Sequence, residues 1–223
     1  MEKNKVKYLI LDFGKVLAGP SSGNWFITPN FYKILKKDKI NLNEFEDCTI
    51  KLNNLISMKM ETELEEYEAF TKFYCEILMH MKYTENVDDM AKKLSNDFVY
   101  NDKKYTMYED TKENLKRLSQ KYKLILLSDN WPCAFRIMKN LGIDQYFDKL
   151  YISSVYDCQK KDGILFDYPI KDYNIKPGEA IFVDDNEELV DIANEKGLKS
   201  IIMDREGTIK ESKYRKIYSL NEL

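Results

Sequence analysis

The chain carries Tyr-Leu-Ile-Leu-Asp at residues 8–12, an apolar run followed directly by a carboxylate. The same arrangement returns as Leu-Ile-Leu-Leu-Ser at 124–128 and as Ala-Ile-Phe-Val-Asp-Asp at 180–185. Short apolar runs of this kind predict buried strands. In an open α/β sheet the ligand crevice lies outside the carboxyl ends of the strands. We therefore expect the polar residues that end these runs to meet at one edge of a sheet.

Strand-like and helix-like segments alternate over much of the chain. Strand-like runs lie at 7–13, 124–128, 150–153, 180–183 and 199–203, and helix-like stretches lie at 111–120, 135–141 and 187–196. Gly197 falls where a glycine often follows the end of a helix. This alternation indicates βαβ units. The predicted fold is therefore α/β, with a doubly wound, Rossmann-like parallel sheet.

Residues 19–108 interrupt the alternation with helical patterns. Two apolar stripes follow helical spacing: Phe70, Phe73, Tyr74, Ile77, Leu78 and Met81, and Phe45, Cys48, Leu52, Leu55 and Ile56. Thr62 and Glu65 have the spacing of a capping box just before the first stripe. We predict an α/β core domain at 1–18 and 109–223, with an α-helical cap domain inserted at 19–108.

The composition argues against several classes of function. The 223 residues carry a net charge of −3 with no basic block, so a nucleic-acid partner is not expected. The four cysteines lack CxxC spacing and the chain has one histidine, which disfavours a zinc site or a disulfide framework. The first apolar run is too short for a signal peptide or a membrane span. The expected location is cytoplasmic, with no membrane partner.

The polar residues near the strand ends suit one kind of chemistry. Carboxylates at Asp12 and Asp184-Asp185, a hydroxyl at Ser128 and an ammonium at Lys160 fit a divalent metal and a phosphoryl group. Each residue alone has a plainer interpretation, because aspartate and serine often cap helices or form turns. Lys161 is a rival to Lys160. The joint pattern favours phosphate chemistry.

Four motifs, in order, resemble those of the haloacid dehalogenase (HAD) superfamily. Leu-Ile-Leu-Asp-Phe-Gly-Lys-Val-Leu at 9–17 is similar to the first, an Asp-x-Asp-x-Thr/Val after an apolar strand. Residues 126–130, 160–166 and 182–186 resemble the second, third and acidic fourth motifs. The helical insertion occupies the place of the C1 cap of subfamily I. Response-regulator receivers use similar residues, but there the acidic pair comes first in the chain.

This resemblance implies a Mg²⁺-dependent phosphatase that forms an aspartyl-phosphate on Asp12. Asp12, the backbone carbonyl of Gly14, Asp184 and Asp185 would hold the Mg²⁺. Ser128 and the backbone N–H of Asp129 would bind a phosphate oxygen. Lys160 would neutralise charge shared by Asp12 and the phosphoryl group. The implied partner is a small phosphorylated metabolite.

Gly14 departs from the commonest first motif, which has a second aspartate there that protonates the leaving oxygen. A positioned acid or base contributes about 10²–10⁴ in rate. Its loss favours good leaving groups, such as an anomeric sugar oxygen or an acyl group, and glucose-1-phosphate phosphatase-like members also lack it. The side chains of Lys15 and Asp129 are ionisable and nearby, but the sequence gives no reason to make either of them the general acid.

Two alternatives remain open. Asp12 is also the residue that a 2-haloacid dehalogenase-like hydrolase would use, although the retained acidic pair weighs against a metal-free enzyme. The other alternative is a non-catalytic HAD-like binding protein. Trp25 and Trp131 are candidates for the mouth of the site or for packing, whereas His80 is expected at the surface or packed rather than catalytic.

Overall fold

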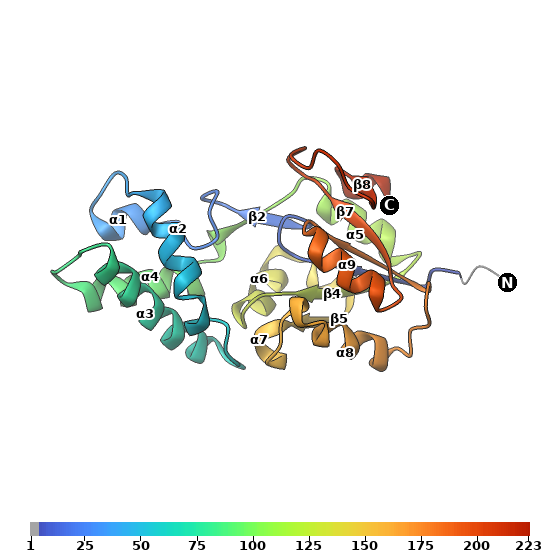
Figure 1. Ribbon diagram of the computed structural model, residues 1–223, viewed down its shortest axis with the longest axis horizontal. Coiled ribbons are helices and arrows are strands. Elements are labelled where there is room, and N and C mark those ends of the chain that lie inside the picture. The colour runs from blue at the N-terminus through green and yellow to red at the C-terminus, as the bar shows by residue number, and fades with distance from the viewer. Residues whose placement is uncertain (1–4) are drawn as a thin grey trace. The chain divides into compact units, whose positions relative to one another are not determined.

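A computed structural model describes residues 5–223 (Figure 1). The chain folds into two compact units. The first contains residues 5–19, 107–130 and 134–223. The second contains residues 20–106 together with residues 131–133. The short segment 131–133, which the sequence did not associate with the helical insertion, thus belongs to the second unit.

A six-stranded sheet forms the centre of the first unit, with strand order β5-β4-β1-β6-β7-β8. Neighbouring strands are parallel throughout. The strands are β1 (Tyr8–Leu11), β4 (Lys123–Ser128), β5 (Phe147–Ile152), β6 (Ala180–Asp184), β7 (Lys199–Met203) and β8 (Arg215–Ile217). The chain builds outward from β1 to β5, then returns to the other side of β1 to form β6. The strand order therefore reverses between β1 and β6, where a doubly wound sheet has its ligand crevice.

Helices cover this sheet because its strands are apolar on both sides. The helices are α5 (Thr111–Ser119), α6 (Cys133–Leu141), α7 (Ser153–Tyr156), α8 (Ile164–Asp172) and α9 (Glu187–Glu195). Ile10, Ile125 and Phe182 pack in one buried cluster with residues of α8 and α9. Leu9 and Leu11, whose side chains point to the opposite face, are also fully buried. Burial of both faces is typical of parallel sheets, and the predicted fold class is confirmed.

The edges of the sheet differ most from the sequence prediction. β5 begins at Phe147 rather than at residue 150 and ends at Ile152, and the next residue starts α7. As an edge strand, β5 tolerates the polar pair Asp148-Lys149, whose side chains form ion pairs with Lys123 at 3.2 Å and Asp172 at 2.6 Å. The opposite edge strand, β8, is short and polar and was not predicted.

The second unit is mainly helical. Its helices are α1 (Phe31–Leu35), α2 (Leu42–Lys51), α3 (Glu63–His80) and α4 (Val87–Tyr100). The chain crosses between the units near β2 (Ala18–Pro20) and β3 (Tyr105–Met107), which pair in a two-stranded sheet. The capping box that opens α3 is confirmed, because Thr62 Oγ1 accepts from Glu65 N and Thr62 N donates to the Glu65 carboxylate. The Phe70 and Phe98 rings of α3 and α4 stack with their centroids 3.9 Å apart.

The second apolar stripe does not form one continuous helix, so that expectation is wrong. α2 ends at Lys51, and the following Asn53–Leu55 is a 3₁₀ turn. Asn53 and Asn54 explain the break, because asparagine favours caps and turns over helix interiors. Phe45, Cys48 and Ile56 are nevertheless buried, as the pattern indicated.

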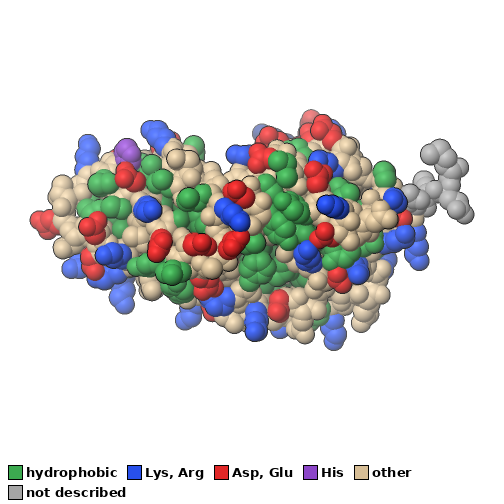
Figure 2. All heavy atoms as spheres, turned by 90° about the horizontal axis from the view of Figure 1, so that it is seen from below, with side chains coloured by type: hydrophobic (Ala, Val, Ile, Leu, Met, Phe, Trp, Pro, Cys, Tyr) green, Lys and Arg blue, Asp and Glu red, His purple; other side chains and the backbone are tan. Residues whose placement is uncertain are grey.

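Two general properties bear on function. Within residues 5–223, no helix combines the length and the apolar character needed to cross a bilayer. Figure 2 shows acidic and basic side chains interspersed over the face it displays, rather than gathered into one charged surface.

Candidate active site

Three neighbouring strands bring the predicted polar residues together at the carboxyl ends of the strands, at one end of the sheet. Leu11 of β1 lies beside Val183 of β6, and the next residues on the two strands are Asp12 and Asp184. On the other side of β1, Leu11 lies beside Leu126 of β4, which ends two residues later at Ser128. Residues far apart in the sequence therefore meet because parallel strands end together.

The carboxylates of Asp12, Asp184 and Asp185 form one cluster. Each offers a ligand oxygen, and these oxygens all lie within 4.8 Å of one another. Asp12 and Asp184 are buried, whereas the Asp185 side chain is 31% exposed. An Asx-type contact shapes the turn after β6, because Asp184 Oδ1 accepts from Asn186 N at 2.9 Å. Asn186, rather than either aspartate, is the N-cap of α9.

Lys160 lies inside this cluster. Its Nζ is 3.0 Å from Asp12 Oδ1 and 2.6 Å from Asp184 Oδ2, and its side chain is 2% exposed. A 3₁₀ turn at Lys160–Asp162 presents it, and Gly163 ends that turn with a φ of 73°, a left-handed value that glycine adopts without strain. The rival Lys161 is exposed. Burial among carboxylates therefore distinguishes Lys160, the lysine that we predicted for the site, from its rival Lys161.

The electrostatics of the cluster are those of an excess of negative charge. Burial tends to lower the pKa of Lys160, but the charges of Asp12, Asp184 and Asp129 raise it above its usual value. Burial also raises the pKa of Asp184, even though Lys160 acts in the opposite direction. The pKa of Asp185 is raised to about 6, first by burial and then by the charge of Asp12. One buried ammonium thus faces three carboxylates whose negative charges repel one another.

The donor set fits a hard divalent cation. Carboxylate oxygens are the ligands that Mg²⁺ prefers in proteins. Asp12 Oδ1 is buried and accepts no hydrogen bond from the described residues, because the nearby Lys160 ammonium contacts it as an ion pair without hydrogen-bond geometry. A buried carboxylate oxygen in this state is unusual without a further positive partner. Gly14, whose carbonyl was the fourth predicted ligand, follows two residues after Asp12.

Ser128 and Asp129 lie at the same end of the sheet, where β4 ends. Ser128 is 1% exposed at the end of the strand. Asp129 has a contact that the sequence did not predict, because its Oδ1 accepts from the backbone N of Lys160 at 3.0 Å. Ser153 was also missed: its Oγ accepts from Asn130 N at 3.1 Å and thereby steadies the turn after Ser128. It follows the end of β5, so the strand-end rule applied to this edge strand could have found it.

Further residues singled out in the sequence lie elsewhere or at the margin. Trp131 donates from Nε1 to the Ile56 carbonyl at 2.8 Å and packs against Phe70 within the second unit. Trp25 contacts the Tyr105 ring edge-on, and His80 is exposed at the end of α3. Lys15 reaches only the exposed side of the cluster, with its Nζ 4.0 Å from Asp185 Oδ2.

Comparisons with known proteins show the family of the chain and agree with its fold. The family model described as haloacid dehalogenase-like hydrolase matches residues 26–193. A D-ribitol-5-phosphate phosphatase from Bacteroides thetaiotaomicron is 31% identical over 90 residues, and the match spans 37% of this chain and 44% of that enzyme. The magnesium-bound HAD-hydrolase YfnB from Bacillus subtilis superposes with a TM-score of 0.73 at 11% identity, over 98% of this chain and 97% of that one. A 2-haloacid dehalogenase from Pseudomonas syringae gives a TM-score of 0.66 at 12% identity, over 97% and 96% of the two chains.

Proposed function

The chain belongs to the haloacid dehalogenase-like hydrolase family, and we propose that it is a Mg²⁺-dependent phosphomonoester hydrolase acting through Asp12. The observation that carries the proposal is the buried cluster of Asp12, Asp184 and Lys160, with Asp185 beside it. A metal-free enzyme would gain nothing from three carboxylates so close together, because their mutual repulsion is costly. A divalent cation and a phosphoryl group would both be stabilised there.

The metal site would use ligands already assembled at the strand ends. Asp12, Asp184, Asp185 and the carbonyl of Gly14 would hold Mg²⁺, which keeps several water ligands of its own. When bound, Mg²⁺ would offset the negative charge of a phosphoryl group and of the attacking carboxylate. Lys160 would add a second, permanent positive charge in contact with Asp12.

The proposed reaction has two steps, and Asp12 takes part in both. A carboxylate oxygen of Asp12 forms a bond to phosphorus while the ester P–O bond breaks and the leaving oxygen keeps the electron pair, to be protonated from solvent. Water then attacks phosphorus and gives up a proton to solvent while the bond between phosphorus and the Asp12 oxygen breaks, which releases inorganic phosphate and restores the Asp12 carboxylate. Ser128 and the backbone N–H of Asp129 would bind a phosphoryl oxygen in both steps.

The substrate class we propose is a small phosphorylated carbohydrate. The relative in Bacteroides thetaiotaomicron is named for a sugar-alcohol phosphate, which supports this class. Gly14 supplies no acid for the leaving oxygen, which favours an anomeric or acyl phosphate over a phosphate on an ordinary alcohol. The rates of hydrolysis of ribitol 5-phosphate and of a sugar 1-phosphate would show which of the two arguments, the likeness to the relative or the leaving-group effect of Gly14, predicts the preferred substrate.

We also propose that residues 19–108 act as a cap that selects the substrate. This segment has its own aromatic core, including Phe70, Phe73 and Phe98. A separately folded unit of this kind is suited to exclude water from a site in the core domain.

The proposal is tested by hydrolysis of p-nitrophenyl phosphate and acetyl phosphate, with Mg²⁺ and with EDTA. Asp12→Asn should abolish turnover and EDTA should do the same, while Asp38→Asn, at an exposed aspartate, should leave activity unchanged. Turnover that survives both Asp12→Asn and EDTA would contradict the proposal. Halide release from a 2-haloacid without metal would instead support the dehalogenase alternative.

A further inference from the structure

The loop that follows Asp12 is tightly folded. Leu17 N and Ala18 N both donate to the Phe13 carbonyl, at 2.9 and 3.1 Å, and Lys15 N donates to the Ala18 carbonyl at 2.8 Å. Lys15 has a φ of 51°, a left-handed conformation that a non-glycine residue adopts only when its surroundings hold it there. Gly14, the predicted carbonyl ligand, lies inside this loop.

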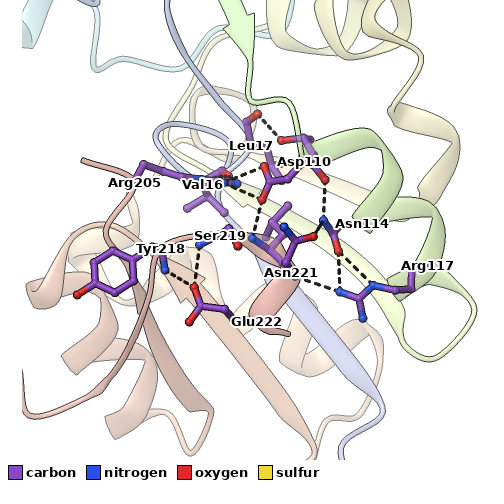
Figure 3. Close-up of polar contacts among 12 residues, drawn as sticks. Val16, Leu17, Asp110, Asn114, Arg117, Arg205, Tyr218, Ser219, Asn221 and Glu222 are labelled. Carbon is purple, nitrogen blue, oxygen red and sulfur yellow. Dashed lines mark hydrogen bonds and ion pairs between the residues drawn. The ribbon is translucent and has the colours of Figure 1, made fainter. Parts of the chain in front are cut away.

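Two carbonyls of the loop each accept hydrogen bonds from two donors. The Val16 carbonyl accepts from Arg205 Nε at 3.2 Å and from Arg205 Nη2 at 2.7 Å (Figure 3). The Leu17 carbonyl accepts from Tyr108 N at 3.1 Å and from Thr111 Oγ1 at 2.8 Å. Among these donors, Arg205 is therefore the side chain that binds one carbonyl of the loop through two nitrogen atoms of its forked guanidinium group.

Arg205 is itself fixed on its other side. Its Nη1 lies 2.8 Å from both carboxylate oxygens of Asp110, and its guanidinium lies over the Tyr108 ring, 4.4 Å from the centroid. The Arg205 side chain is 7% exposed and that of Asp110 14%. Asp110 in turn accepts from Leu220 N at 2.7 Å, near the C-terminus. A planar, five-donor guanidinium can bond to a carboxylate and a carbonyl while its face lies on a ring, whereas the compact ammonium of lysine has neither the rigid fork nor the planar face.

We infer that Arg205, braced by Asp110, is a positioning residue that fixes the loop at residues 13–18 and with it Gly14 beside Asp12. The hydrogen bonds of Arg205 go to Val16 and Asp110 rather than to the carboxylates of the proposed metal site, so its role is indirect. The catalytic part of this inference rests on the proposed function. The structural part, that Arg205 holds the loop, does not.

Arg117 provides a matched control from the same network. Its Nη2 donates to Asn114 Oδ1 at 2.6 Å and to the Leu220 carbonyl at 3.1 Å (Figure 3). It is thus tied to the C-terminal segment, as Asp110 is, but its hydrogen bonds go to Asn114 and Leu220 rather than to Val16 or Leu17 of the loop. Arg117→Ala removes an arginine and loosens the C-terminus, while the contacts to Val16 and Leu17 stay.

The experiment compares hydrogen exchange of the Leu17 and Ala18 amides in the wild type, Arg205→Ala, Arg205→Lys and Arg117→Ala. Exchange should rise about tenfold or more in both Arg205 variants and stay at the wild-type rate in Arg117→Ala. If Arg205→Ala does not fold, two milder variants still test the inference. Arg205→Lys removes the two-nitrogen contact with the Val16 carbonyl, and Asp110→Asn removes the charge that holds Arg205 on its other side. Wild-type exchange at both amides in every folded Arg205 and Asp110 variant would overturn the inference.

Kinetics test the catalytic part. In the Arg205 variants kcat for p-nitrophenyl phosphate should fall by about tenfold to a hundredfold, because a small misplacement of a site is costly, while KM changes little. Added guanidinium should restore part of kcat to Arg205→Ala and none to Arg117→Ala. A loose loop with unchanged kcat would overturn the catalytic part. A wild type without phosphatase activity would instead contradict the proposed function, and the exchange result would still decide whether Arg205 holds the loop.

Discussion

Gly14 is the residue at which this chain departs most clearly from the phosphatase pattern, and its backbone does not demand a glycine. The φ angle of Gly14 is not positive, so the backbone conformation is open to any L-amino acid. The turn does not require a glycine at this position. The lack of a carboxylate at residue 14 therefore bears on the chemistry of the site rather than on its backbone.

Gly14→Asp should restore acid catalysis for poor leaving groups. We expect kcat/KM for an alkyl monophosphate to rise relative to that for p-nitrophenyl phosphate by about 10²-fold, the lower end of what a positioned acid contributes. The ratio of the two kcat/KM values at one pH measures this directly. Gly14→Asn is the control of equal size. An equal ratio in the Asp and Asn variants would show that the added side chain acts through shape alone.

Lys160 lets stability and catalysis be separated. Lys160→Met should lower the free energy of unfolding of the metal-free protein by about 3–5 kcal/mol, because Asp12 and Asp184 lose their buried counter-charge. The same loss of positive charge should strengthen Mg²⁺ binding while turnover falls by about 10² or more. Urea unfolding with and without Mg²⁺ measures the first two effects. Lys161→Met, at an exposed neighbour, should change none of them; weaker Mg²⁺ binding in Lys160→Met would contradict the shared site.

The residues that the sequence could identify are those that follow strand ends. Asp12, Ser128 and Asp184 were found because an apolar run fixes a strand, and the strand fixes where the next side chain lies. The strand-end rule could not choose Lys160 over Lys161, because both lie in an irregular segment. The resemblance to the third motif favoured Lys160, and in the structure burial distinguishes the two. Arg205 was missed although it comes two residues after the end of β7, because its partners Asp110 and Val16 are distant in the sequence.

Among the helices, α4 depends on a buried carboxylate. Asp97 accepts from the backbone N of Asn30 at 2.7 Å, from the Asn30 side chain at 2.6 Å and from the Asn101 side chain at 2.7 Å. Burial raises the pKa of Asp97, but the hydrogen bonds from Asn101 and Asn30 act in the opposite direction, and the pKa is lowered overall. The ionised form thus holds the start of α1 against the end of α4.

This lowered pKa predicts how the second unit responds to acid. The contribution of Asp97 is fully present above its unfolded pKa of about 3.9 and is lost as pH falls through the lower folded pKa. Asp97→Asn should cost about 1.5–3 kcal/mol at pH 7, typical of hydrogen bonds to a charged group. The difference from the wild type should shrink below about pH 4. Urea unfolding followed by tryptophan fluorescence measures it, with the exposed Asp89→Asn as control. A difference independent of pH would contradict the assignment.

The elements themselves were predicted best where their pattern is repeated and buried. The helix that became α3 has a long stripe and a capping box, and both its type and its start were correct. The stripe that was expected to continue α2 failed at Asn53 because side-chain spacing carries no information on local turn preference. β8 and the start of β5 were not predicted, because edge strands are partly exposed to solvent and therefore need fewer apolar residues.

Across the molecule, the two units carry different probes. Both tryptophans of the chain, Trp25 and Trp131, belong to the second unit. The proposed metal ligands Asp12, Asp184 and Asp185 all belong to the first. Tryptophan fluorescence therefore reports on one unit, and hydrogen exchange in β1 and β6 reports on the other. The division of the chain can be tested without altering a residue.

Mg²⁺ should stabilise the first unit selectively. At about 100 times its dissociation constant a ligand adds about 2.7 kcal/mol to the unit that binds it. We expect the free energy of opening measured by exchange in β1 and β6 to rise by this amount, while the urea midpoint of tryptophan fluorescence stays within error. Asp12→Asn, which removes a proposed ligand, should abolish the effect. Equal shifts by both probes would mean that the two units unfold together, because a ligand held by one part stabilises another only when the two share one cooperative transition.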